Sequence, residues 1–276
     1  AIGMHIEGLH DVQKFIDATY KALKYNTPLV VLKTGTSQVG AQLTISHTGS
    51  LSGANELYQA LFDRLGIIQV DSPSQLIETL KFLCISGVPK GNKVMGFTCS
   101  GGGATMLADY AEKVGLEFIQ PTPETAEVLR EQLTAIATVS NPLDYTTPIW
   151  GQQEPVEAVI ATACSDQHHA AIIVQDYPLP GLDETKHYYF NDTKAFVNAT
   201  RAASLPAAVC CTLQENLDEE TRDYLVSAAS DALPIIFCVC RRRVDRGPDS
   251  ACYALQAAPA RAACHRLAAS RRRLVD

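Results

Sequence analysis

The chain has 276 residues, 19% of them charged, and a net charge of −7. This length is enough for about two domains, and the negative charge excludes a general nucleic-acid binder, which needs a basic face. No run approaches the ~18 apolar residues of a membrane span. Five cysteines lie in apolar or helical surroundings without paired ligand spacing: Cys84, Cys99, Cys164, Cys210 and Cys211. We interpret them as reduced thiols and therefore expect a cytoplasmic protein.

The first 87 residues alternate between strand and helix patterns. The apolar run at residues 1–9 predicts a buried strand, and Asp11 is a suitable N-cap for the helix that follows. A loop is expected over residues 34–46. The remaining elements are predicted as strands at Leu29–Lys33 and Ile67–Val70 and helices at Val12–Lys24, Ala54–Arg64 and Ser74–Cys84.

Turn residues between Gly87 and Asn92 indicate a domain boundary, after which a second alternation begins. Strands alternating with helices of this length predict parallel sheets with helices on both faces. The expected strands are Lys93–Thr98, Glu117–Ile119, a short strand ending at Asn141–Asp144, Ala170–Val174 and Ala207–Thr212. A helix is expected after the glycine turn and through Lys113. Four further helices are expected at Thr125–Leu133, Glu154–Cys164, Thr193–Ala203 and Leu217–Ala229.

Residues 236–276 differ in composition from the rest, with nine Arg, no Lys and three Asp. Their cysteines and His265 match no paired metal-binding spacing, and an Arg-rich interaction tail is an alternative. We interpret the segment as a product of translation out of frame near residue 237 and assign it no fold and no function. Resequencing the coding region tests this hypothesis, and one continuous frame would refute it.

A histidine loop precedes the helix at Ala54–Arg64. His47 lies among small hydroxyl and glycine residues, including Thr48, Gly49 and Ser50, so a bulky group can approach its imidazole. The amides of a helix start favour negative charge, as a phosphoryl group would bring. The pattern fits a nucleophile, and it also fits a surface histidine in a turn where Ser50 or Ser52 caps the next helix.

A second glycine-rich turn follows the strand at Lys93–Thr98. Ser100, Gly101, Gly102 and Gly103 begin a helix whose backbone amides can face a phosphate. The turn lacks the full spacing of a dinucleotide or Walker motif, and a tight turn that needs glycine for close packing is the alternative. Together the two features would place two anion-binding helix starts around one phosphoryl group.

The chain resembles the ADP-forming acyl-CoA synthetases and the related succinyl-CoA synthetases. The resemblance covers about residues 1–235 and rests on several separated motifs: Ile6-Glu7-Gly8, Val31 to Gly35, Ser46 to Ser50, Thr98 to Gly102 with Asp109, and Asn141 to Asp144. It implies two flavodoxin-like parallel-sheet units. Residues 1–87 would be the C-terminal part of an alpha-like domain that carries the phosphohistidine loop, truncated at its N-terminus, and residues 90–235 a beta-like domain.

The resemblance also implies a phosphohistidine mechanism. Acyl-CoA and phosphate give an acyl phosphate and CoA, the phosphoryl group passes to His47 and then to ADP, and the sequence is reversible. Glu7 matches a carboxylate that hydrogen-bonds the histidine, which orients the ring and raises its nucleophilicity. Residues 100–103 match the turn whose amides hold the phosphoryl group, and Thr48, Gly49 and Ser50 belong to the phosphate-binding loop.

Parts of such an enzyme are absent from these 276 residues. The family's CoA-binding domain and its ATP-grasp module, which binds nucleotide and Mg²⁺, have no counterpart here. We therefore expect no cofactor bound by this portion alone, inactivity in isolation, and partner modules in cis or in trans. A truncated first unit should expose a sheet edge, which predicts poor solubility or an oligomer.

Other assignments of function remain open. The main alternative is a non-catalytic regulatory or scaffold module of the same architecture, for example attached to an acyltransferase. A flavodoxin-like FMN binder would need a hydroxyl-rich phosphate loop after a first strand, which the sequence lacks. Lys33, at a strand end, is equally consistent with a phosphate contact and with a solvated side chain.

Overall fold

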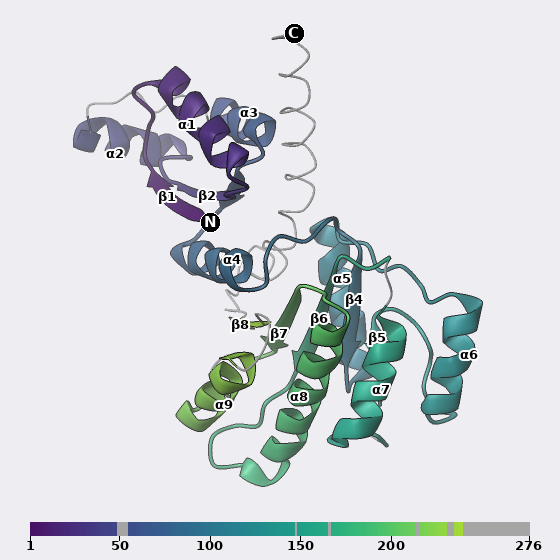
Figure 1. The fold of residues 1–276 in the computed structure, drawn as a ribbon. Coiled ribbons are helices and arrows are strands. Elements are labelled where there is room, and N and C mark those ends of the chain that lie inside the picture. The colour runs from purple at the N-terminus through teal and green to yellow at the C-terminus, as the bar shows by residue number, and fades with distance from the viewer. Residues whose placement is uncertain (49–54, 147, 165–166, 214–215, 231–234, 240–276) are drawn as a thin grey trace.

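The computed structural model describes the chain except for residues 49–54, 147, 165–166, 214–215, 231–234 and 240–276. Two parallel sheets organise it (Figure 1). The first has three strands in the order β1-β2-β3, at Ile2–Ile6, Leu29–Lys33 and Ile68–Val70. The second has five in the order β5-β4-β6-β7-β8, at Leu143–Asp144, Val94–Thr98, Ala170–Gln175, Ala207–Cys211 and Ile235–Val239.

Helices of the first unit begin where capping chemistry allows. Asp11 accepts a hydrogen bond from Lys14 N at 2.8 Å and starts α1, and Ser72 accepts one from Gln75 N at 3.2 Å and starts α4 behind Pro73. The four helices are α1 (Val12–Lys24), α2 (Gln38–Thr48), α3 (Asn55–Leu65) and α4 (Pro73–Ile85).

The second unit follows the same rule at α5 and α6, which Ser100 and Thr122 cap. Its sheet order places β4 between β5 and β6, so the chain runs outward from β4 to β5 and then crosses back past β4 to β6. The helices are α5 (Gly101–Lys113), α6 (Pro123–Gln132), α7 (Gln153–Ala163), the short 3-10 helix η1 (Asp183–Thr185), α8 (Lys186–Ala202) and α9 (Glu219–Ser230).

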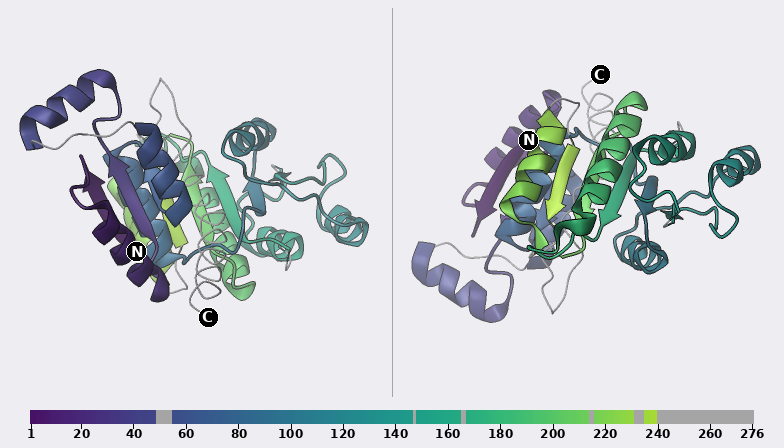
Figure 2. Two further views of the ribbon diagram at one scale, coloured as in Figure 1. Left: turned by 90° about the horizontal axis from the view of Figure 1, so that it is seen from above. Right: turned by 90° about the horizontal axis from the view of Figure 1, so that it is seen from below.

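The helix α4 joins the two units through one apolar core. Its Phe82 and Leu83 pack in the same buried cluster as Val30 of β2 and Ala208 of β7, and Ser86 Oγ, just after α4, donates to the Ala207 carbonyl at 3.0 Å. Figure 1 shows α4 lying between the two sheets, and Figure 2 gives the same arrangement from above and from below. The first sheet is thus covered by α1 and α3 on one face, through the cluster that includes Phe62, and by α4 on the other.

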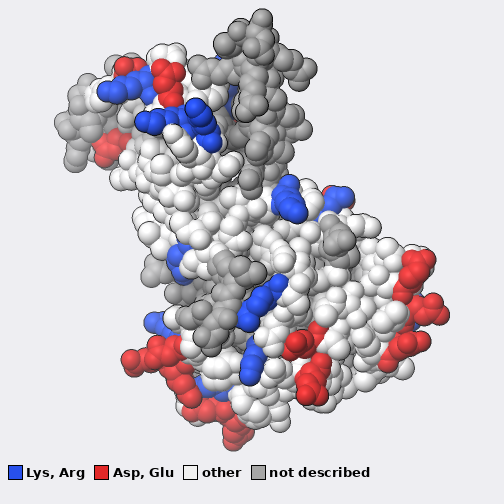
Figure 3. Space-filling model, viewed as in Figure 1, with Lys and Arg blue, Asp and Glu red and all other residues white. Residues whose placement is uncertain are grey.

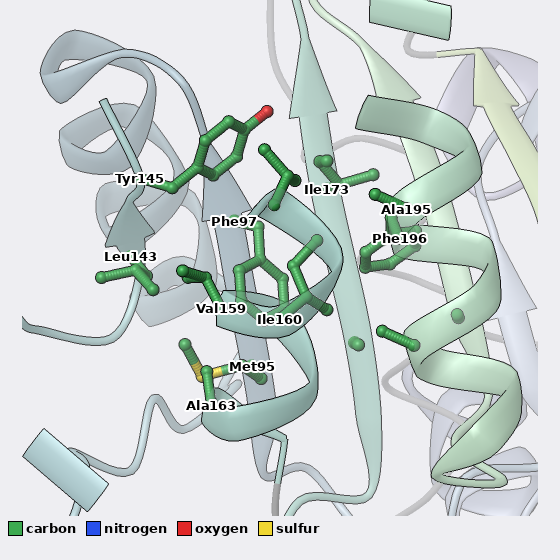
Figure 4. Packing of buried hydrophobic residues seen from close by; sticks show 14 of the residues in the cluster. Met95, Phe97, Leu143, Tyr145, Val159, Ile160, Ala163, Ile173, Ala195 and Phe196 are labelled. Atoms are coloured by element: carbon green, nitrogen blue, oxygen red, sulfur yellow. The ribbon is translucent and has the colours of Figure 1, made fainter. Parts of the chain in front are cut away.

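The core of the second unit lies mainly between its sheet and α7 and α8. Figure 4 shows Phe97, Ile160, Ile173 and Phe196 in contact there, and all four side chains are at most 1% exposed. Burial of aliphatic and aromatic side chains on this scale contributes about 2 kcal/mol for each. None of the helices in the described parts of the chain has the length and apolar content that a membrane span requires.

The α/β class with parallel sheets is confirmed, and four local expectations were wrong. Residues 38–48 form α2 where a loop was expected. The β1 strand, predicted to be buried, is an edge strand with Ile2 43% exposed. Only an isolated bridge between Lys93 and Glu117 replaces the strand expected at residues 117–119.

The fourth correction concerns the tail, to which we assigned no fold from residue 236. Strand β8 continues to Val239, because its apolar run pairs in parallel with the whole of β7. Residues 240–276, including Cys240, Cys252, Cys264 and His265, lie outside the described residues, and the frame-shift hypothesis stays a prediction.

Candidate active site

The first candidate site is the carboxyl edge of the three-stranded sheet. Glu7 follows the last residue of β1, and the parallel register pairs Ile6 with Lys33, so the ends of β1 and β2 lie together. An open hollow of about 480 Å³ lies at this edge, and its lining is Met4, His5, Ile6, Glu7, Gly8, Leu9, His10 and Phe15. The sheet therefore presents Glu7 at a surface that another group can reach.

The carboxylate of Glu7 is incompletely paired. Its Oε2 is buried and has no hydrogen-bond partner among the described residues. Buried polar atoms in proteins are nearly always hydrogen-bonded, so an unpaired carboxylate oxygen indicates a place where a donor is still to arrive. An imidazole N–H is a donor of the required kind.

Lys33 contacts the backbone of Glu7 and is neither solvated nor placed on an open phosphate site. Its side chain is only 5% exposed. Its ammonium donates to the Glu7 carbonyl oxygen at 2.8 Å and to the carbonyl of Thr34, and it lies 4.7 Å from the centre of the Tyr58 ring. Burial lowers the pKa of Lys33, and the charge of Glu7 opposes that shift.

The histidine predicted to meet Glu7 is only partly described. The backbone of His47 belongs to the last turn of α2, together with Thr48, but the side chains at residues 44–48 lie outside the described residues, as do Gly49 and Ser50 altogether. The chain re-enters the described part at α3, whose Tyr58 hydroxyl accepts from Leu9 N at 3.0 Å. The helix after the histidine segment is thereby tied to the Glu7 turn.

The second candidate site is the glycine turn at the carboxyl end of β4. Ser100 Oγ accepts from Gly103 N at 3.3 Å and the Ser100 carbonyl from Ala104 N at 2.9 Å. The amides of Gly101 and Gly102 are left without a partner among the described residues, as expected in a first helical turn. The turn therefore has the free N–H groups that anion binding requires.

The charges around the second-unit helices differ from one helix start to the next. The first turn of α5 has no acidic residue, whereas η1 and α9 begin with Asp183, Glu184, Glu219 and Glu220. Figure 3 shows carboxylates gathered at this lower end of the unit. The α5 turn has one acidic neighbour, since a Cβ added at Gly101 would lie 3.4 Å from Asp144 Oδ2.

The structure does not bring the two candidate sites together. Glu7 ends a strand of the first sheet and the glycine turn starts α5 on the second, while Figure 1 shows α2 at the end of the first unit remote from the second sheet. Among the described residues no hydrogen bond or ion pair links Glu7 to residues 100–103. In the same part of the chain, no group of three or more His, Cys, Asp or Glu residues is arranged to hold a metal.

Sequence reasoning did not find a buried carboxylate beside the glycine turn. Asp192 of α8 is fully buried and accepts hydrogen bonds from the Tyr145 hydroxyl at 2.7 Å and from Gly151 N at 2.9 Å. Burial raises the pKa of Asp192 to about 6, and the two hydrogen bonds partly oppose the shift. Burial, with help from the Asp192 charge, also raises the pKa of the nearby Cys99 thiol to about 12, which makes it a poor nucleophile. The one signal for Asp192 in the sequence is that a charged residue stands among the apolar positions of the helix α8.

Comparison with known proteins identifies the first unit. Residues 1–83 match the model of the succinyl-CoA ligase like flavodoxin domain. The first unit is therefore similar to that domain over its three strands. Its strand order, its open β1 edge and the carboxylate at the end of β1 belong to this ligase-like domain.

The wider chain is similar to ADP-forming acyl-CoA synthetases, which confirms the resemblance. It is 34% identical over 152 residues to the alpha subunit of ADP-forming acetate–CoA ligase II of Pyrococcus furiosus, covering 55% of this chain and 33% of that protein. It is 29% identical over 220 residues to ADP-forming acetate–CoA ligase I of Archaeoglobus fulgidus, covering 79% of this chain and 30% of that protein. The chain thus spans about a third of the length of these relatives.

A solved structure shares the fold over both units. The dinucleotide-forming acetyl-coenzyme A synthetase 1 of Ca. Korarchaeum cryptofilum, in complex with phosphate and ADP, matches with a TM-score of 0.75 at 20% identity. The match covers 96% of this chain and 54% of that one. The ligase-like domain and the second sheet therefore have counterparts in a single known chain.

Proposed function

We propose that this chain is the phosphohistidine-carrying portion of an ADP-forming acyl-CoA synthetase. Together with its partner modules, it interconverts acyl-CoA, ADP and phosphate with free acid, CoA and ATP through a phosphorylated His47. The observation that carries the proposal is Glu7, which lines an open hollow and whose buried Oε2 has no partner among the described residues. The similarity to acetate–CoA ligases supports the reaction class.

The proposed steps balance without any further reactant. Phosphate attacks the thioester carbonyl of the acyl-CoA, and CoA leaves to give an acyl phosphate. A ring nitrogen of His47 then attacks the phosphorus, the P–O bond to the acyl group breaks and the carboxylate departs. A terminal phosphate oxygen of ADP takes the phosphoryl group from the histidine, which gives ATP and restores the imidazole.

The residues of this chain contribute orientation and charge to these steps. Glu7 accepts a hydrogen bond from one imidazole nitrogen, which orients the ring and makes the other nitrogen more nucleophilic. The free amides at Gly101 and Gly102 stabilise phosphoryl oxygens when the segment carrying His47 reaches them, and Thr48, Gly49 and Ser50 let the group approach. Binding of CoA, ATP or ADP and Mg²⁺ falls to the partner modules.

Labelling of the complete protein, assembled with its nucleotide-binding module, tests the proposal. After incubation with ATP labelled in its γ-phosphate and Mg²⁺, we expect an acid-labile, base-stable label on the chain that His47→Ala abolishes. His5→Ala and His10→Ala remove the two histidines that line the Glu7 hollow and are expected to keep it. Label that survives in His47→Ala would refute the mechanism and favour a regulatory module.

A further inference from the structure

The first unit buries the charged side chain of Lys33 without an ion pair among the described residues. Transfer of an ammonium group out of water costs several kcal/mol unless strong partners replace the water. Lys33 forms no ion pair among the described residues, and its hydrogen-bond acceptors are two uncharged carbonyl groups. A methionine of similar length would fill the same space without the desolvation cost, so packing alone does not account for this residue.

The hydrogen bonds of Lys33 act on the backbone that carries Glu7. The ladder between β1 and β2 ends with the pair Ile6 and Lys33, followed by the bond from Thr34 N to the Ile6 carbonyl at 3.1 Å. Glu7 lies one residue beyond the strand. The bond from the Lys33 ammonium to the Glu7 carbonyl extends the connection between the two strands to that residue.

Tyr58 fixes the same turn from the other side. Its ring faces the Lys33 ammonium, a cation–π arrangement, while its hydroxyl accepts from Leu9 N. Tyr58 is 8% exposed and belongs to α3, the helix into which the chain runs after the histidine segment. Lys33 and Tyr58 together therefore hold the turn from Glu7 to Leu9 against the helix that follows His47.

We propose that Lys33 is a positioning residue, whose buried ammonium holds the Glu7 backbone and so fixes the carboxylate of Glu7 at the open edge of the first sheet. This inference rests on the proposed function and adds a residue to it. Lys33 contacts neither substrate nor the phosphoryl group; it acts through Glu7. Displacement of a catalytic group by about 1 Å can cost on the order of a hundredfold in rate, so a loosened Glu7 turn should slow phosphoryl transfer.

A double-mutant cycle in the assembled protein tests the inference. Lys33→Met is expected to slow single-turnover phosphorylation of His47 by about ten- to a hundredfold, with the KM for ATP within about twofold of wild type. In a Glu7→Gln background the same substitution should have almost no further effect, because residues that act through one another are not additive. Lys21→Met, an exposed lysine of α1, serves as the matched control and should leave the rate unchanged.

The outcomes separate this inference from the proposed function. If Lys33→Met slows labelling equally with and without Glu7, or does not slow it at all, the positioning role is refuted while a label lost in His47→Ala still supports the phosphohistidine. If Lys33→Met does not fold, Lys33→Gln replaces it in the cycle, since its shorter side chain removes the ammonium that bonds the Glu7 carbonyl but keeps a polar group at this position. An additive effect of Lys33→Gln and Glu7→Gln would likewise overturn the inference.

Discussion

The two units differ in how they hold a carboxylate near the carboxyl edge of the sheet. Glu7 directly follows β1, whereas Asp192 belongs to α8 and bonds Tyr145, which follows β5. At the first edge, Glu7 has a buried oxygen without a partner among the described residues, beside an open hollow. At the second, Asp192 is fully buried, and hydrogen bonds from Tyr145 and Gly151 occupy both carboxylate oxygens. A carboxylate whose partners come from its own unit holds a loop in place, whereas one that lacks a partner is suited to receive a donor from a moving segment. In the proposed mechanism the first edge therefore serves chemistry, whereas the hydrogen bonds of Asp192 serve packing in the second unit.

Among the variants that test this comparison, substitution of Glu7 should have the largest effect on the rate of phosphorylation. Glu7→Gln should slow phosphorylation of His47 by about a hundredfold, since the neutral amide cannot stabilise the positive charge that develops on the ring. Its free energy of unfolding should change by less than about 1 kcal/mol, because the affected oxygen makes no hydrogen bond among the described residues. Rapid-quench labelling and urea denaturation measure the two quantities.

Asp192→Asn is the matched variant for the other edge. It should label at the wild-type rate and lose about 1–3 kcal/mol of stability near pH 4, where Asp192 is protonated and an amide nitrogen would face one of the two donors. Equal labelling by Glu7→Gln and wild type, or strongly reduced labelling by Asp192→Asn, would contradict the division of roles between the two edges.

The pH dependence of stability sharpens the same contrast. Because the folded-state pKa of Asp192 is raised to about 6 from 3.8, the folded protein holds the proton more tightly than the unfolded chain between these values. The penalty is absent below pH 3.8 and complete above pH 6, so stability from this group falls as the pH rises through that window. The full difference is about 3 kcal/mol.

Denaturant titrations of wild type and Asp192→Asn at a series of pH values isolate this contribution. All other groups titrate in both proteins, so the wild-type unfolding free energy minus that of the variant should fall between pH 4 and pH 7. A difference that is constant across this range would show that Asp192 titrates normally and that its burial carries no such penalty.

The sequence predicted most of the fold because local patterns and caps agree with the tertiary structure. Asp11 and Ser72 each start a helix as their positions indicate, and the apolar run at Leu29–Lys33 is buried throughout. Prediction from the sequence failed where contacts with distant parts of the chain determine the local structure. Glu117 meets Lys93 through a single bridge, and the helix at residues 38–48 has no strong apolar face to announce it.

The sequence predicted individual residues of the candidate site but not the contacts that bury and pair them. Glu7, His47 and the glycine turn came from spacing and resemblance, whereas the burial of Lys33 depends on the Glu7 carbonyl and Tyr58, which are distant in sequence. Asp192 likewise depends on Tyr145 and Gly151, more than forty residues away. Burial and pairing of charged groups are properties of the packed chain, so no local pattern carries them.

Substitutions in the glycine turn should have the smallest effects. They distinguish a turn that binds phosphate from one that needs glycine for close packing. A Cβ at Gly103 would lie 2.7 Å from Thr98 Oγ1, a side chain that is 2% exposed, whereas the nearest atom to a Cβ at Gly102 is Ser100 Oγ at 3.7 Å. Gly103→Ala should therefore destabilise the protein by about 1–2 kcal/mol through overpacking. Gly102→Ala should leave it equally stable or up to about 1 kcal/mol more stable, since alanine favours the helix.

Labelling of the glycine variants then distinguishes packing from phosphate binding. If the amides of the first turn receive the phosphoryl group, the methyl group of Gly102→Ala narrows the approach to them and slows transfer several-fold in a protein that is fully folded by thermal denaturation. If the turn serves packing alone, Gly102→Ala transfers at the wild-type rate and only Gly103→Ala differs, in stability. If an added methyl group at Gly102 slows phosphoryl transfer without lowering the stability of the protein, the backbone at Gly102 faces the phosphoryl group.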